Sequence, residues 1–256
     1  MKFDDLDAMM RVYERSIDQC ILPDMYIVAR LDGRSFTRLT KEICSFEAPF
    51  DVRFRDLMTD TVKELFGCGS RIIYGYTESD EISLLFHPDD NSFGRKVRKI
   101  NTTLAGEASA VFSLALGQRA TFDCRVVPLP NMKRVTDYFS WRMEDSHRNS
   151  LNAHCYWLLR KEGMSVAEAT AALSGKSISY KNELLFERGI NYNDLPSWQK
   201  RGIGIYPKKV IKTGYDPHKD IPVEYERREL YTDLELPLRD QYRAFIEDIL
   251  RRADEE

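Results

Sequence analysis

Residues 71–86 have the sequence RIIYGYTESDEISLLF, in which two runs of β-branched, aromatic and aliphatic residues flank a short polar segment. This pattern predicts a β-hairpin whose strands span 71–76 and 82–86 and whose tip spans 77–81. The tip carries the carboxylates of Glu78, Asp80 and Glu81. The sequence thus predicts a buried pair of strands joined by an acidic turn.

Segments with strand and helix character alternate around this hairpin. A core strand is predicted over 26–31, a helix beginning with a proline over 49–66, a long helix over 92–116 and a last strand over 121–127. The order is then β-α-β-β-α-β, the ferredoxin-like pattern in which two helices cover an antiparallel sheet. We therefore expect an α+β fold, preceded by a helix over 3–17.

The chain beyond the last predicted strand differs in character. Helices are predicted over 137–161 and 165–173, a loop-rich stretch follows over 181–196, and a charged helix runs from about residue 238 to the end. We expect two domains, a catalytic domain over 1–130 that includes the N-terminal helix, and a mostly helical, loop-rich region over 131–256.

The composition of the 256-residue chain restricts its class. Hydrophobic residues make up 43% of it, enough for a sizeable core, and the net charge of −3 gives no overall positive field for nucleic acid. The five cysteines form no C-x-x-C pair, which argues against a disulfide framework and a cysteine zinc site. No apolar run approaches the roughly 20 residues that cross a bilayer, so we expect a cytoplasmic protein without a membrane partner.

Two aspartates are predicted to meet at one edge of the sheet. Asp32 follows the first strand and Asp80 lies in the hairpin, and these positions are adjacent in a β-α-β-β-α-β sheet. Paired carboxylates and carbonyl oxygens suit magnesium, and two such ions can serve nucleotidyl transfer. Gly33, Arg34 and Ser35 add backbone N–H groups for phosphate. Asp-Gly and Ser-Asp-Glu are also ordinary turn sequences, so the residues alone leave both interpretations open.

Four blocks in the same order resemble the tRNA-histidine guanylyltransferase superfamily. The first two are RLDGRSF at 30–36 and ESDEIS at 78–83, which are similar to the family's R-I-D-G-R-x-F and Q-S-D-E-Y-S. FDCRVV at 122–127 and KNELLF with INYN within 181–193 are similar to its later blocks. The resemblance covers nearly the whole chain through about residue 210, and four ordered blocks are more specific than one motif.

The resemblance implies a polymerase-like palm domain that adds nucleotides in the 3′-to-5′ direction at the 5′ end of tRNA. ATP or GTP first activates the tRNA 5′-monophosphate, and the 3′-hydroxyl of an incoming nucleotide then attacks it. Two Mg²⁺ ions are implied, held by Asp32, the Gly33 carbonyl and Asp80, with Glu81 as a weaker candidate for a catalytic ligand. A homotetramer is implied too, and we expect residues 131–256 to contribute to tRNA binding. The residues implied in nucleotide binding are Asp32, Gly33, Arg34, Ser35, Phe36, Thr37, Ser79 and Asp80.

One block departs from the family pattern. Members specific for histidine tRNA carry H-I-N-N-L-Y-N, whereas residues 147–153 are HRNSLNA, which retains the histidine, one asparagine and the leucine. Altered forms of this block resemble the tRNA-histidine guanylyltransferase-like branch, which repairs 5′-truncated tRNA on a template. We therefore expect template-directed repair or editing of tRNA 5′ ends, with guanine addition to histidine tRNA as the alternative.

Further basic and polar residues are candidates for contact with nucleotide or tRNA. Lys99 is expected to point to the same sheet edge as Asp80 and to bind a triphosphate, although the basic cluster around it is also typical of a solvated helix face. A helix-packing role for His147 is equally open. The candidate contacts are Arg30, Arg95, Lys96, His147, Asn149, Lys181 and Asn193, with a second basic patch at Arg201, Lys208, Lys209 and Lys212.

Two other classes of protein share the predicted fold. A nucleotide cyclase would use the same aspartates without RNA. An RNA-binding module would stack bases on aromatic side chains of its central strands. In such a module Asp32 and Asp80, at the strand ends, would repel phosphate unless a metal intervened.

Overall fold

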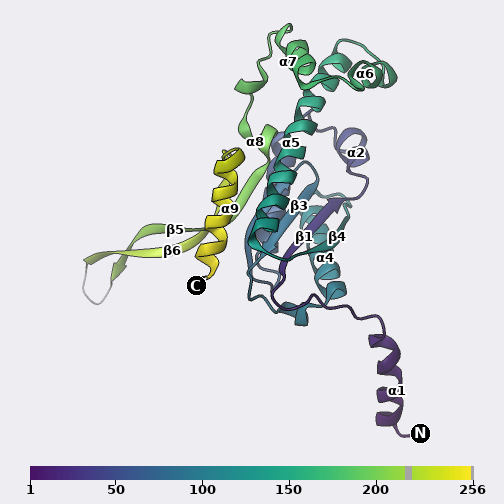
Figure 1. Cartoon of the computed structure of the whole chain (residues 1–256), viewed down its shortest axis with the longest axis vertical. Coiled ribbons are helices and arrows are strands. Elements are labelled where there is room, and N and C mark those ends of the chain that lie inside the picture. Colours follow the sequence, from purple (N-terminus) through teal and green to yellow (C-terminus); the bar gives the residue numbers. More distant parts are fainter. Residues whose placement is uncertain (217–220, 255–256) are drawn as a thin grey trace.

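The computed structural model describes residues 1–216 and 221–254. Over these residues six strands form one antiparallel sheet, in the order β4-β1-β3-β2-β5-β6 (Figure 1). The first four strands of the chain are arranged 4-1-3-2, the ferredoxin-like order, and confirm the predicted α+β fold. They are β1 (Tyr26–Gly33), β2 (Ile72–Glu78), β3 (Glu81–Phe86) and β4 (Phe122–Leu129).

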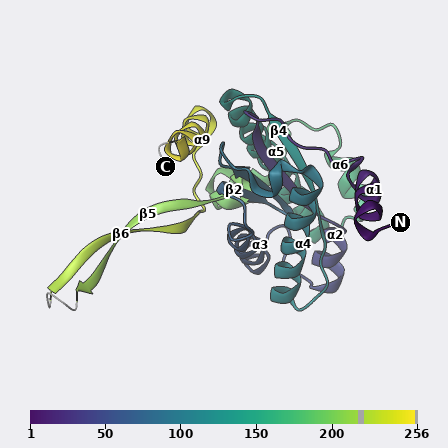
Figure 2. The same ribbon diagram turned by 90° about the horizontal axis from the view of Figure 1, so that it is seen from below.

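Helices cover both faces of this sheet (Figure 2). One face is covered by α3 and α4 and the other by α5 and α9. Alternate side chains of β1 point to opposite faces of the sheet. Ala29 and Leu31 pack in the first core, beneath α3 and α4, and Val28 packs in the second core, beneath α5 and α9. Tyr74 and Tyr76 of β2 are buried in the second core, so the central strands do not offer them for base stacking. The bounds are α3 (Val52–Leu65), α4 (Val97–Leu116), α5 (Met132–Lys161) and α9 (Arg239–Asp254).

A long hairpin, β5 (Ile203–Asp216) and β6 (Ile221–Asp233), completes the sheet and was not predicted from the sequence. Ile203 to Ile205 pair with Thr77 to Gly75 of β2, after which the two strands leave the sheet and project from the body (Figures 1 and 2). Charged residues alternate irregularly with apolar ones along both strands, which hides the strand pattern. The C-terminal region therefore adds a strand to the same sheet that carries the two aspartates.

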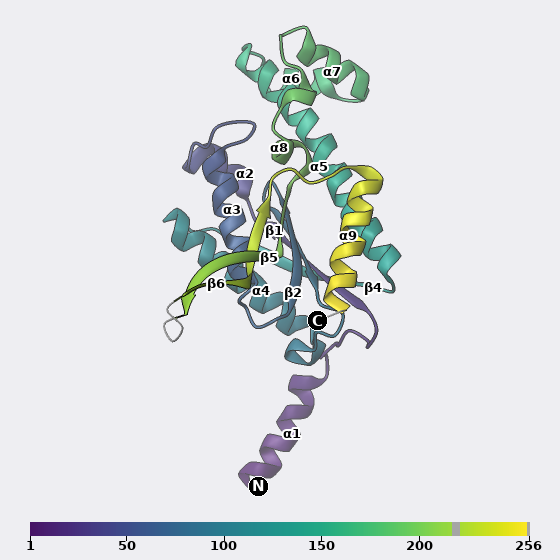
Figure 3. The same cartoon turned by 90° about the vertical axis from the view of Figure 1, so that its left-hand side faces the viewer.

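Shorter helices lie at the two ends of the molecule. In the described part of the chain α1 (Phe3–Arg15) projects from the body and buries none of its residues (Figure 3). Helices α6 and α7 pack against the far half of α5, and α7 contains residues 181–183, which were predicted to lie in a loop. The remaining bounds are α2 (Phe36–Arg38), η1 (Leu39–Ile43), η2 (Ser92–Arg95), α6 (Val166–Leu173), α7 (Ile178–Phe186), η3 (Tyr192–Asp194) and α8 (Ser197–Arg201).

Candidate active site

Asp32 and Asp80 come together at one edge of the sheet, as predicted. Asp32 is the penultimate residue of β1 and lies opposite Glu81 of β3. The Gly33 N–H donates a hydrogen bond to the Asp80 carbonyl oxygen at 3.0 Å. A Cβ atom at Gly33 would lie 2.9 Å from the Asp80 Cβ and 2.5 Å from the Phe36 ring. Only glycine permits this approach. The lack of a side chain at residue 33 therefore determines how closely the end of β1 lies to the turn that carries Asp80.

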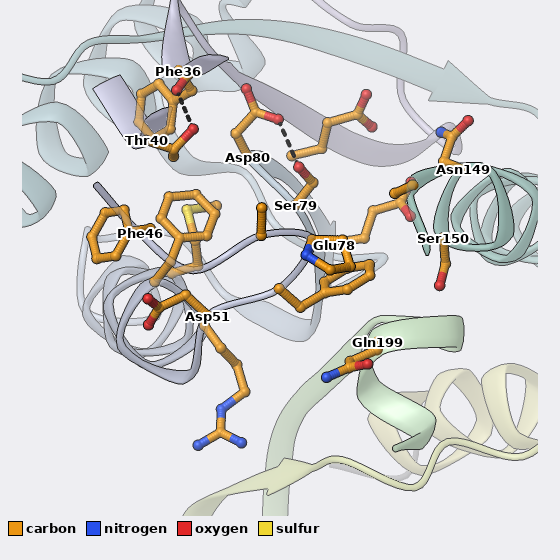
Figure 4. A pocket seen from close by; sticks show the side chains of 18 of the residues that line it. Phe36, Thr40, Phe46, Asp51, Glu78, Ser79, Asp80, Asn149, Ser150 and Gln199 are labelled. Atoms are coloured by element: carbon orange, nitrogen blue, oxygen red, sulfur yellow. Dashed lines mark hydrogen bonds between the residues drawn. The ribbon is translucent and has the colours of Figure 1, made fainter. Parts of the chain in front are cut away.

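The tight turn between β2 and β3 presents Asp80. Glu78 and Glu81 pair across the hairpin and leave only Ser79 and Asp80 in the turn. Ser79 has a φ of 47°, a left-handed conformation that non-glycine residues adopt rarely. Its hydroxyl donates to Asp80 Oδ1 at 3.1 Å (Figure 4). The Thr77 hydroxyl closes the hairpin by donating to the Glu81 carbonyl oxygen at 2.9 Å.

The electrostatics of this edge favour a bound cation. Burial, reinforced by repulsion from Asp32, raises the pKa of Asp80 to about 6. Among the described residues Asp80 has no ion-pair partner, and Asp32 is 3.7 Å from Arg30 Nη2. A half-buried carboxylate beside a second carboxylate is a hard-oxygen donor set that suits a divalent cation such as Mg²⁺. No cluster of three or more His, Cys, Asp or Glu side chains with metal-binding geometry occurs within 1–216 and 221–254, so protein carboxylates alone would not saturate such an ion.

Glu81 was expected as a weaker metal ligand, but its carboxylate is engaged by two arginines. Its two carboxylate oxygens accept hydrogen bonds from Arg30 and from Arg142, a buried residue of α5. Glu81 is therefore already neutralised, and the carboxylates left for a cation are those of Asp32 and Asp80. Sequence reasoning missed Arg142. The available signal was a charged residue at helical spacing from Val135, between the apolar neighbours Trp141 and Met143.

The predicted phosphate-binding turn is only partly free. The Gly33 N–H is bonded to Asp80, and the Arg34 N–H donates to the Thr121 carbonyl oxygen at 2.8 Å, so neither is available to a phosphate. Ser35, with a φ of 62°, begins the helical segment of α2 and η1, whose first N–H groups have no partner within the helix. The Phe36 side chain is buried in the core and also lines the pocket beside Asp80.

A pocket with a volume of about 360 Å³ opens beside Asp80 (Figure 4). Its volume lies in the range of small-molecule sites, which runs from about 300 to 1,000 Å³. Polar side chains of α5 line one wall at helical spacing, and Asn149, a predicted contact to nucleotide or tRNA, is among them. Aromatic rings that the sequence did not single out line other parts of the pocket. These lining residues are Phe46, Phe50, Phe54, Trp157 and Trp198, with Thr37, Asp51, Ser146, Ser150 and Gln199.

The prediction that Lys99 shares a sheet edge with Asp80 is wrong within this chain. The C-terminal end of α4 leads into β4, where Asp123 pairs with Asp32. Lys99 lies in the first turn of this 20-residue helix, about 26 Å from its other end. Arg95 and Lys96 precede it, and Arg95 donates to the carbonyl oxygen of Met25, at the opposite end of β1. All of these cations therefore lie at the far edge of the sheet.

The remaining candidate contacts lie outside the pocket. The His147 ring contacts Tyr192 at 5.3 Å between centroids, and burial lowers its pKa, which favours the packing role. Lys181 lies on α7, and the Asn193 carbonyl oxygen accepts from Lys200 Nζ at 2.6 Å.

The second basic patch is largely engaged within the protein. Lys209 pairs with Glu226 at 3.3 Å, and Lys212 pairs with Glu229. Arg201 donates to the Leu236 carbonyl oxygen at 2.9 Å. Lys208 stands over the Tyr231 ring, 4.4 Å from its centroid. Acidic partners therefore offset part of the positive charge that was expected to meet RNA.

Comparison with known proteins gives matches along most of the chain. Residues 7–130 match the family model described as tRNAHis guanylyltransferase, and residues 133–235 match that of the Thg1 C terminal domain. The chain is 35% identical over 206 residues to a tRNA(His) guanylyltransferase of Debaryomyces hansenii, covering 75% of this chain and 77% of the relative. It is 34% identical over 204 residues to a probable tRNA(His) guanylyltransferase of Drosophila melanogaster, covering 76% and 71%.

Solved structures that resemble this chain belong to the same family. The tRNA(His) guanylyltransferase from Saccharomyces cerevisiae has a TM-score of 0.69 and 31% identity, covering 76% of this chain and 91% of its own. A bacterial tRNA(His) guanylyltransferase (Thg1)-like protein in complex with ATP has a TM-score of 0.75 and 26% identity, covering 96% and 99%. A complex of a bacterial Thg1-like protein with GTP has a TM-score of 0.71.

Across the described residues, no helix is both long and apolar enough to cross a membrane.

Proposed function

Because this chain belongs to the tRNA(His) guanylyltransferase family, we propose that it transfers a guanine nucleotide to the 5′ end of tRNA(His). Membership in the family makes it a nucleotidyltransferase. The observation that carries the proposal is the convergence of Asp32 and Asp80 at the mouth of a pocket of about 360 Å³. Relatives that carry the guanylyltransferase name support guanine addition more directly than the repair activity that the altered block at 147–153 indicates.

Asp32, Asp80 and the Gly33 carbonyl are the groups that would hold Mg²⁺. Two bound ions would supply Lewis-acid stabilisation of the phosphates. We propose that a triphosphate lies over Ser35 to Thr37 and Ser79, with its base in the aromatic pocket. The structures of Thg1-like proteins in complex with ATP and GTP support nucleotide binding by this chain.

In the proposed reaction the tRNA 5′-monophosphate first attacks the α-phosphorus of ATP or GTP and displaces pyrophosphate. The 3′-hydroxyl of the incoming GTP then loses its proton and attacks the activated 5′-phosphorus. A nucleoside monophosphate leaves, and the extended tRNA keeps the triphosphate of the added nucleotide. Catalysis of both steps rests on positioning and charge, because phosphoryl transfer gives the protein little covalent chemistry to perform.

Template-directed repair of shortened tRNA is the second candidate. Two observations favour it: the HRNSLNA sequence at 147–153, and the likeness to a Thg1-like protein over 96% of this chain. Under this proposal the added nucleotide pairs with the opposite strand of the acceptor stem. The C-terminal region 131–256, whose α5 lines the pocket, would then help to hold the stem.

One assay separates the two candidates. Purified protein is incubated with Mg²⁺, ATP, all four nucleoside triphosphates and 5′-monophosphorylated tRNA, either histidine tRNA or a tRNA that lacks its first nucleotide. Guanine addition to histidine tRNA regardless of the opposing base supports the guanylyltransferase. Addition that follows the opposing base supports templated repair. A chain that adds nothing to either RNA, or that converts GTP to a cyclic product without RNA, contradicts both.

A further inference from the structure

Arg142 is the most deeply buried cation near the site, and it contacts neither Asp32 nor Asp80. Its side chain is 3% exposed. Its Nη2 donates to Glu78 Oε1 at 3.0 Å and also to Glu81 Oε2, and its Nη1 lies 3.3 Å from Asp145 Oδ2. Both glutamates come from the hairpin, whereas Arg142 and Asp145 come from α5. One guanidinium therefore joins the hairpin to the helix.

The position of these contacts along the hairpin is specific. Glu78 and Glu81 pair with each other directly on either side of the turn that contains Ser79 and Asp80. Arg142 therefore bonds to the last residue before the turn and the first residue after it. A planar guanidinium that bridges two carboxylates restricts their separation and orientation more than a single point charge can. The contact fixes the base of the turn that carries Asp80.

The network continues from the hairpin to the other aspartate. The second oxygen of Glu81 accepts from Arg30, whose Nη2 is also 3.7 Å from Asp32 Oδ2. Arg30 is part of β1, so the chain of contacts runs from α5 through the hairpin to the strand that carries Asp32. Arg142 thus lies at one end of a continuous set of ion pairs that runs through Glu81 and Arg30 to Asp32, while Glu78 and Glu81 connect it to the turn that carries Asp80.

We propose that Arg142 is a positioning residue that holds the β2–β3 turn so that Asp80 meets Asp32 at the geometry needed for two-metal nucleotidyl transfer. This inference rests on the function proposed above. Arg142 contacts neither of the two aspartates, and it acts through Glu78 and Glu81. Its positive charge also offsets part of the negative charge of Glu78 and Glu81, which reduces their competition with Asp32 and Asp80 for the cation.

The charge of Arg142 and its geometry predict opposite effects on metal binding. If Arg142 acted only through its positive charge, its removal would strengthen cation binding, because it leaves more uncompensated carboxylate nearby. If it positions the turn, its removal weakens cation binding despite the added negative charge. The Arg142→Lys substitution keeps the charge but loses the bridge between two carboxylates. Together, Arg142→Met and Arg142→Lys separate the two effects.

The experiment measures Mn²⁺ binding to the full chain by electron paramagnetic resonance, with ATP present and without RNA, and nucleotide addition in parallel. We expect Arg142→Met to bind Mn²⁺ at least tenfold more weakly. Its kcat should fall by about 100-fold with little change in the KM for GTP, as expected for a misplaced catalytic group. Arg142→Lys should remain about tenfold below the wild type in kcat. Arg243→Met is the matched control, because Arg243 also pairs with an α5 carboxylate, that of Asp137, but on the α9 side. It should leave both measurements unchanged.

Several results would overturn the inference: unchanged or tighter Mn²⁺ binding by folded Arg142→Met, or full activity of Arg142→Lys. If Arg142→Met does not fold, the double variant Arg142→Met with Glu78→Gln removes a buried charge together with its partner. That variant should fold and still bind Mn²⁺ weakly, and wild-type binding by it would contradict the proposal. A wild-type chain that binds Mn²⁺ but adds no nucleotide would refute the proposed function alone, since the binding comparison between variants still decides the role of Arg142.

Discussion

At the scale of single residues, the carboxylate of Asp80 is expected to lower the free energy of unfolding of the metal-free chain. Because its folded pKa of about 6 lies above the usual value for aspartate, the folded state binds more protons than the unfolded state between about pH 4 and 6. Stability should therefore decrease as pH rises through this window. Asp80→Asn should remove this dependence, stabilise the metal-free chain at pH 7 by about 1 to 2 kcal/mol, and abolish nucleotide addition.

Thermal unfolding at pH 4.5 and pH 7, with and without Mg²⁺, measures this effect. Mg²⁺ should raise the melting temperature of the wild type, because a ligand that binds only the folded state stabilises it, and should not raise that of Asp80→Asn. Equal melting temperatures for the two proteins at pH 7 without metal would contradict the prediction.

Gly33 is the second residue whose change should be decisive. In Gly33→Ala the new methyl group would overlap the Phe36 ring and press on the Asp80 Cβ, so β1 and the turn must move apart. A displacement of this size at a catalytic pair should lower kcat by about 100-fold. The control is Gly106→Ala in α4, where a Cβ meets no atom within 4 Å among the described residues, and which should be neutral or stabilising by about 0.5 to 1 kcal/mol. Wild-type kinetics for Gly33→Ala would show that the close approach is unnecessary.

At the scale of secondary-structure elements, the hairpin of β5 and β6 has two parts with different energetics. Ile205 is fully buried beside β2, whereas Val210 lies in the projecting part and is half-buried. Ile205→Ala should lower the free energy of unfolding by about 2 to 5 kcal/mol, because it removes core contacts and leaves a cavity. Val210→Ala should change it by less than about 1 kcal/mol.

Urea denaturation followed by tryptophan fluorescence and circular dichroism tests this difference. Since β5 completes the sheet that holds the aspartates, Ile205→Ala should shift a single transition seen by both probes. Separate transitions for the palm and the C-terminal region would instead indicate that residues 1–130 and 131–256 unfold independently, as two domains would.

At the scale of the whole molecule, α1 has an exposed apolar face, and we propose that further copies of the chain cover it. Its exposed apolar side chains recur at helical spacing, and within one chain no described residue covers them. We expect a homotetramer with a mass near four times 29.9 kDa by light scattering. Replacing Met9 and Tyr13 by glutamate should reduce this mass while the palm stays folded. A mass near that of one chain for the wild type would contradict the prediction.

The sequence by itself determined the parts of this protein that depend on local pattern. Alternation and turn chemistry predicted β1, the β2–β3 hairpin and β4, and the order of the elements alone placed Asp32 and Asp80 at one edge. Tertiary structure alone decided the rest. Lys99 lies at the far edge because α4 must run back along the sheet to deliver β4, and β5 joins β2 through pairing remote in sequence. Arg142 gains its partners only when α5 crosses the hairpin, since contacts between residues more than 60 positions apart leave no periodic trace in either segment.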